Sequence, residues 1–117
     1  MYSVTAAFIE WLNNLGFDAH SYPPAEGSEF VTVERTGGGV SDMVDRPSLA
    51  IQTWAKTEER AEDMANSIRY LLLTETPPTG VHSVFINTGA YRFYDESTRL
   101  PRFQLVIDVV CQLTESR

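Results

Sequence analysis

The hydrophobic residues of this chain recur at helical spacing in two places. The first apolar stripe belongs to a helix that starts near Ser3 or Thr5 and stops at Gly16, a residue that readily takes the left-handed conformation of a helix end. The stripe consists of Val4, Ala7, Phe8, Trp11, Leu12 and Leu15. Thr57 is suited to cap a second helix. Its stripe consists of Ala61, Met64, Ala65, Ile68, Leu71 and Leu72.

Alternating apolar residues predict four strands in the remaining segments. Residues 30–34 and 49–54 precede the second helix; a strand around residues 83–86, within the segment 81–93, and a strand over residues 103–113 follow it. The last strand has six apolar residues at period two, which fixes the face that it buries. They are Phe103, Leu105, Ile107, Val109, Cys111 and Leu113.

The segments between these elements have the composition of turns. Residues 18–28 contain Pro23-Pro24 and are expected to form a loop, and residues 37–39, all glycine, are expected to break the first strand. Gly89 is expected to bend or bulge the third strand. The order α-β-β-α-β-β predicts an α+β fold, with two helices packed on a mixed or antiparallel sheet whose last two strands form a hairpin.

Composition limits the function classes. The chain has 117 residues, 43% of them hydrophobic, which suits a single domain spanning residues 1–117. Its net charge is −7 and its nine basic residues are scattered, so we expect no specific nucleic-acid binding and no binding to an anionic membrane. No apolar run reaches the roughly 20 residues of a membrane helix, and no signal peptide is expected.

The sequence offers no catalytic set, cofactor loop or metal centre. His20 and His82 have no nucleophile to pair with, and Cys111 falls on the apolar face of its strand as a small hydrophobe. The glycines at 37–39 are not followed by the Lys-Ser/Thr of a phosphate loop. We therefore expect a non-enzymatic protein with no cofactor and no bound metal.

Charged residues beside the glycines are candidates for contacts between subunits. Asp42, Asp45 and Arg46 flank this segment. Two interpretations of Asp45-Arg46-Pro47 stay open. The first is a turn in which the carboxylate caps backbone N–H groups, and the second is an intersubunit salt bridge.

Two further groups are candidates outside the glycine segment. Trp54 lies on the strand face opposite the apolar residues of its strand, so it either contacts a partner or joins a second core layer. Arg99 and Arg102, with Asp95, form a second charged cluster, for which a solvated hairpin loop is the alternative.

Two stretches resemble one protein family. The first reads Val33-Glu34-Arg35-Thr36-Gly37-Gly38-Gly39, then Asp45-Arg46-Pro47, then Leu49-Ala50-Ile51-Gln52-Thr53-Trp54-Ala55. The second contains Asp95-Glu96 and Arg99, followed by Pro101-Arg102-Phe103-Gln104-Leu105. Both resemble the small tail terminator, or tail completion, proteins of long-tailed siphophages, notably those that infect actinobacteria. The order of elements in that family matches this chain nearly end to end.

The resemblance implies a structural role in phage assembly. Members of that family form a ring, usually a hexamer, that caps the tail tube, stops its polymerisation and offers a docking surface to the head. The expected partners are further copies of the chain, the major tail tube protein and the neck or head-completion protein. The expected location is the head-proximal end of the virion tail, after assembly in the host cytoplasm. The glycine segment and the Asp-Arg-Pro segment would lie at ring or tube contacts.

Two alternatives remain open at this point. One is a neck or head-closure ring protein, which shares the small α/β subunit and the ring. The other is a cellular ligand-binding α+β module. A small enzyme is disfavoured because no nucleophile–base pair is present in the sequence pattern.

Overall fold

The computed structural model describes residues 3–41, 44–92 and 100–112, which form two helices and five strands. In chain order these are α1 (Val4–Asn14), β1 (Ala19–His20), β2 (Phe30–Ser41), β3 (Val44–Trp54), α2 (Glu58–Thr74), β4 (Val81–Arg92) and β5 (Arg102–Gln112). The strands form one mixed sheet in the order β1-β2-β3-β5-β4. β1 is parallel to β2, and the other neighbouring strands are antiparallel. The α+β fold expected from the sequence is confirmed.

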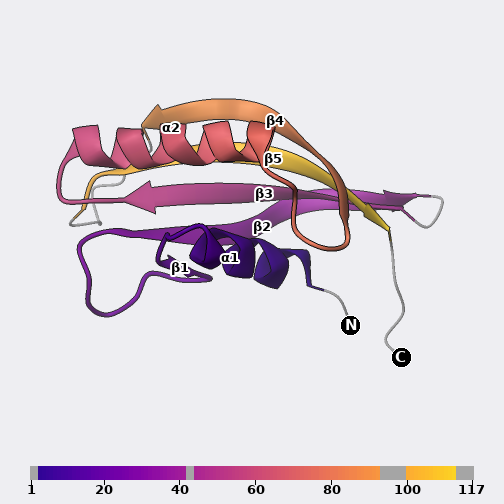
Figure 1. Cartoon of the computed structure of the whole chain (residues 1–117), viewed down its shortest axis with the longest axis horizontal. Helices are drawn as coiled ribbons and strands as arrows, with labels where there is room; N and C mark the ends of the chain where they lie inside the picture. The colour runs from indigo at the N-terminus through magenta and orange to yellow at the C-terminus, as the bar shows by residue number, and fades with distance from the viewer. Residues whose placement is uncertain (1–2, 42–43, 93–99, 113–117) are drawn as a thin grey trace.

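Both helices cover the same face of the sheet (Figure 1). α1 packs on β1 and β2, whereas α2 packs on β3, β5 and β4. Buried side chains of both helices, such as Phe8 and Ile68, belong to one apolar cluster with the strand residues beneath them. The opposite face of the sheet carries no helix among the described residues, so it is called the helix-free face below.

The predicted ends of α1 are confirmed. Ser3, one of the two predicted caps, accepts a hydrogen bond from the N–H of Ala6. Gly16 has a φ of 101°, and the N–H of Phe17 donates to the carbonyl of Leu12. This is a Schellman turn, which directs the chain from the helix into β1.

The second helix also begins and buries its side chains as predicted. Thr57 accepts a hydrogen bond from the N–H of Arg60, and α2 ends at Thr74 before the two prolines. The buried residues of α2 are Ala61, Met64, Ala65 and Ile68. Leu71 and Leu72 are only partly buried, because the helix runs out toward the edge of the core.

Three strand predictions were wrong. β2 does not break at the glycines but continues to Ser41, and β3 begins at Val44 instead of residue 49. β1 was missed, since the prediction for residues 18–28 was a loop. Ala19 and His20 pair with β2 over two residues, which is too short for any alternating pattern to show in a sequence.

The register of the long strands sorts their side chains onto two faces. Val33, Ile51 and Leu105 are paired neighbours under the helices, and each is at most 1% exposed. The buried face predicted for the last strand is therefore confirmed as far as Cys111, while Leu113 lies outside the described residues. Thr32, Gln52 and Gln104 form the adjacent row on the helix-free face.

Candidate assembly interface

The glycine segment and the Asp45-Arg46-Pro47 segment meet in one hairpin. We call residues 35–41 of β2 and 44–48 of β3 the distal hairpin. Within it Gly38 pairs with Pro47, and Gly39 pairs with Arg46. Of the two interpretations of Asp45-Arg46-Pro47, the turn was wrong, because these residues pair in register with β2 along β3.

An ion pair within the chain fastens the distal hairpin. Arg35 Nη2 lies 3.0 Å from Asp45 Oδ1, and Arg35 Nη1 lies 3.3 Å from Asp45 Oδ2. Arg35 Nε also donates to the carbonyl of Gly37 at 3.4 Å. The Asp45 side chain is 15% exposed and that of Arg35 is 41% exposed. Asp45 therefore finds its partner in its own chain, and the pair is too exposed to add much stability.

Only one of the three central glycines is required by the backbone. Gly38 has a φ of 111°, and a Cβ placed on it would lie 2.2 Å from the carbonyl oxygen of Arg46. Gly37 and Gly39 have open space where a Cβ would lie. The pairing register of β2 with β3 also shifts between Arg35 and Gly37, which marks a β-bulge next to the close approach at Gly38. Glycine thus permits the close approach of β2 and β3 here instead of breaking the strand.

Trp54 is buried in its own chain, on the helix-free face. It is 5% exposed and stacks on Phe30, with ring centroids 5.3 Å apart. The guanidinium of Arg102 lies over the other side, 4.5 Å from the Trp54 ring centroid. Of the two interpretations of Trp54, the second core layer is confirmed. Arg102 belongs to this stack within β5 and is buried, so the alternative of a solvated hairpin loop is wrong for this residue.

A single-file chain of hydrogen bonds crosses the helix-free face. The Trp54 indole N–H donates to Thr32 Oγ1, and that hydroxyl donates to Gln52 Oε1, both at 3.0 Å. Gln52 Nε2 donates to Gln104 Oε1 at 2.6 Å, and Gln104 Nε2 donates to the hydroxyl of Tyr91. These hydrogen bonds link β2, β3, β5 and β4, and they satisfy polar groups that are largely buried.

A second polar cluster on the same face is centred on Asp108. Asn87 Nδ2 and Ser48 Oγ each donate to its carboxylate at 2.7 Å. These two hydrogen bonds, that of Asn87 first, hold the pKa of Asp108 below its ordinary value, although burial acts in the other direction. The ionised carboxylate therefore joins β4 to β5 and β3.

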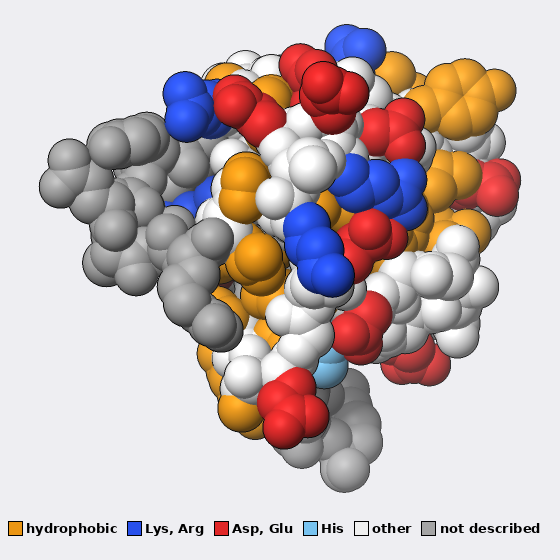
Figure 2. Space-filling model, turned by 90° about the vertical axis from the view of Figure 1, so that its left-hand side faces the viewer, with side chains coloured by type: hydrophobic (Ala, Val, Ile, Leu, Met, Phe, Trp, Pro, Cys, Tyr) orange, Lys and Arg blue, Asp and Glu red, His pale blue; other side chains and the backbone are white. Residues whose placement is uncertain are grey.

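The end of the molecule where β3 passes into α2 has mixed charge. Arg60 donates to both oxygens of Glu29, at 2.9 and 2.8 Å, and to Asp63 at 2.8 Å. The hydrogen bond from Arg60 lowers the pKa of Glu29, and the same bond raises the pKa of Arg60. Figure 2 shows basic and acidic side chains lying next to one another at this end. This surface therefore lacks the uniform positive charge that binds the phosphates of a nucleic acid.

The residues considered for catalysis take ordinary positions. Cys111 is 1% exposed, and burial raises the pKa of its thiol, as expected of a small core residue. His20 contacts Asp18 at 2.8 Å and His82 is exposed on β4. The described ranges contain no group of three side chains arranged to hold a metal. None of the helices in those ranges combines the length and apolarity needed to cross a membrane.

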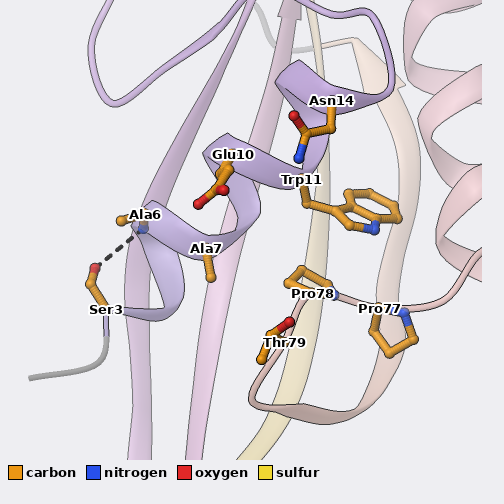
Figure 3. A pocket seen from close by; sticks show the side chains of 9 residues that line it. All are labelled: Ser3, Ala6, Ala7, Glu10, Trp11, Asn14, Pro77, Pro78 and Thr79. Carbon is orange, nitrogen blue, oxygen red and sulfur yellow. Dashed lines mark hydrogen bonds between the residues drawn. The ribbon is translucent and has the colours of Figure 1, made fainter.

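A shallow groove lies between α1 and the turn before β4 (Figure 3). The Trp11 indole N–H donates to the carbonyl of Thr76 at 2.8 Å and holds this turn against the helix. Glu10 is the one titratable side chain among the residues that line the groove. A lone carboxylate does not supply a general acid together with a general base. The lining residues are Ser3, Ala6, Ala7, Glu10, Trp11, Asn14, Pro77, Pro78 and Thr79.

The remaining predicted contact residues fall into two groups. Arg46 is exposed on β3, in line with a surface role. Asp42, Asp95 and Arg99 lie outside the described residues. Sequence reasoning missed Gln52, Gln104 and Asp108, although three polar residues inside otherwise apolar strands are a signal that could have pointed to a polar row.

No family model matches this chain, and no curated protein matches it either.

Proposed function

We propose that this protein is a tail terminator subunit of a long-tailed phage. In this role copies of the chain form a ring at the head-proximal end of the tail. The ring caps the tail tube, stops its polymerisation and offers a surface to the neck or head-completion protein. The protein acts by binding and not by catalysis.

One observation carries the proposal. Two parts of the first stretch that resembles tail terminators, residues 33–39 and 45–47, lie side by side in the distal hairpin, where Gly38 pairs with Pro47 and Gly39 pairs with Arg46. The Arg35–Asp45 ion pair and the close approach at Gly38 both belong to this hairpin. A shared motif that builds one structural unit supports a real relationship more strongly than two isolated short matches do.

The charge of the chain supports the same role. A ring on a tail must let DNA pass through its channel, and a net charge of −7 repels phosphate. Among the described basic side chains, Arg35, Arg60 and Arg92 form ion pairs with carboxylates of their own chain. We expect no measurable binding of duplex DNA at low salt, and tight binding under that condition would argue against the proposal.

Removing the gene from its phage or prophage tests the function directly. Negative-stain electron microscopy of the lysate should show overlong, headless tubes beside DNA-filled heads, because growth of the tube then lacks a stop. Tails of normal length that fail to join filled heads would instead assign the chain to the neck or head-closure proteins. Normal virions would contradict both assignments and return the cellular binding module to consideration.

A further inference from the structure

Two strand edges of the sheet have no partner strand among the described residues. β4 is the last strand of the sheet and pairs with β5 on one side alone. At the other side, β1 covers β2 at Val31 and Thr32 only, which leaves residues 33–41 of β2 with one open edge. Open edges expose rows of backbone N–H and C=O groups that are templates for another strand.

The two open edges match in direction. The four long strands alternate along the sheet, so β2 and β4 run opposite to each other. A second copy placed beside the first in the same orientation therefore presents its β2 antiparallel to β4. The alternation of the sheet then continues from one copy into the next without a break.

The two open edges also match in position along the strands. Residues are called level here when the strand pairing connects them across the sheet. Following the paired residues across the sheet, Arg35 lies level with Ile86, through Leu49 and Ile107. By the same route the glycine segment lies level with Phe85, and the far end of β2 lies level with Val81. The open stretch of β2 thus lies level with β4 from Val81 to Thr88, whereas Tyr91 and Arg92 lie level with Thr32 and Val31, which β1 covers.

Side chains at matching levels are complementary. Phe85 is 59% exposed and shares the helix-free face with its partner Asp108. Gly37, at the same level on the other edge, has no side chain and open space around it. An aromatic ring covering a glycine of the neighbouring strand is a known stabiliser of sheet edges. The pairing would explain an exposed phenylalanine and a glycine-rich edge together.

The charges of the two edges do not oppose the pairing. β2, β3 and β5 each contain a carboxylate, whereas β4 contains none and carries His82 and Arg92. Arg92 contacts Glu58 at 3.1 Å. The open stretch of β2 carries Glu34, which is exposed. In an acidic protein, the strand without carboxylates is the one that a second copy can approach with least repulsion.

We propose that β4 of one copy pairs antiparallel with residues 33–41 of β2 in the next copy, with Phe85 lying over the glycine segment of that neighbour. The contact joins two different edges, so it is heterologous and can close into a ring. The inference rests on the proposed ring function and specifies the surface through which the ring forms.

Disulfide cross-linking of the full chain tests this pairing. The variant that combines Phe85→Cys and Gly37→Cys places a thiol on each edge, and Gly37 has room for the new side chain. Within one copy the two positions are separated by three strand spacings, about 14 Å. This exceeds the roughly 7 Å that a disulfide spans between Cα atoms, so any bond must join two copies. The natural Cys111 is buried and stays in place.

We expect mild oxidation to give a ladder of linked chains that ends at the ring, and each single-cysteine variant to give at most a linked pair. The combination of Gly37→Cys with Tyr70→Cys is the matched control, since Tyr70 is exposed to a similar degree on α2. Phe85→Lys should weaken self-association by about tenfold or more, while Tyr70→Lys should leave it unchanged.

The outcomes separate this inference from the proposed function. A ring that persists in light scattering without a Phe85→Cys/Gly37→Cys cross-link would overturn the edge pairing and leave the ring function standing. A ladder together with normal virions after gene removal would leave the pairing and refute the function. A chain that stays monomeric at millimolar concentration and forms no ladder would contradict both.

Discussion

Replacing Gly38 by alanine should damage the distal hairpin, whereas the same change at Gly37 or Gly39 should not. At Gly38 the new side chain would sit on a backbone with a φ of 111°. Its Cβ would also lie 2.2 Å from the carbonyl oxygen and 2.9 Å from the carbonyl carbon of Arg46, both of which are backbone atoms that cannot rotate away.

The loss of stability in Gly38→Ala follows from the positive φ and from the overlap of the new Cβ with Arg46. Holding a residue other than glycine in a sparsely populated region of φ and ψ costs about 1–3 kcal/mol. Relieving the overlap requires β2 and β3 to move apart locally, so we expect a total loss of about 2–4 kcal/mol in the free energy of unfolding. The loss cannot exceed the free energy of opening the hairpin by itself, because local opening would relieve the strain first. Hydrogen exchange in residues 35–48 should then speed up even where global stability changes little.

Urea denaturation and amide hydrogen exchange measure the two parts of this effect. The controls are Gly37→Ala and Gly39→Ala, which meet no atom within 4 Å. Each should be neutral or stabilise by up to about 1 kcal/mol, because alanine reduces the freedom of the unfolded chain. Equal stability and equal exchange rates in all three variants would refute the assignment of a special backbone role to Gly38.

Three other predictions concern the hydrogen-bonded clusters. A double-mutant cycle on Arg35→Met and Asp45→Asn should give a coupling below about 1 kcal/mol that shrinks in high salt, because the pair is partly exposed; a coupling that is large and independent of salt would contradict this. Trp54→Ala should cost about 3–5 kcal/mol in thermal or urea unfolding, since the ring is buried between two neighbours; a neutral result would mean that the stack contributes nothing. Asn87→Ala should cost about 1 kcal/mol at pH 7. Because the folded pKa of Asp108 is depressed, this contribution is full above the unfolded pKa of about 3.9 and is lost as pH falls through the folded pKa, so denaturation curves of wild type and variant should converge in acid.

The parts of the fold that the sequence predicted are those with a repeated local signal. The stripe of α2 and its Thr57 cap, and the six-residue alternation of the last strand, are decided by patterns that extend over many residues. β1 was missed because its two residues are held by pairing with Val31 and Thr32 and not by any pattern of their own. The glycines at 37–39 were misjudged because the usual meaning of glycine is a break, whereas here it allows two strands to approach.

The candidate interface was less accessible to sequence reasoning. A sequence shows that Arg35 and Asp45 are charged, but their ten-residue separation does not show that they pair across a hairpin. Trp54 had two open interpretations, because its burial depends on Phe30 and on Arg102, a residue 48 positions away along the chain. Long-range register decides these contacts, and a single sequence carries little information about register.

The single-file hydrogen bonds on the helix-free face have a consequence for the accuracy of strand pairing. Every donor in the file points the same way along it, from Trp54 through Thr32, Gln52 and Gln104 to Tyr91. A slip of two residues between any two strands would keep apolar side chains on the core face, so burial alone does not forbid it. The slip would, however, break the hydrogen bonds of the row that cross the displaced pair of strands, and each buried group left unpaired would cost about 1–3 kcal/mol. The polar row thus stabilises the native register of the strands relative to registers shifted by two residues.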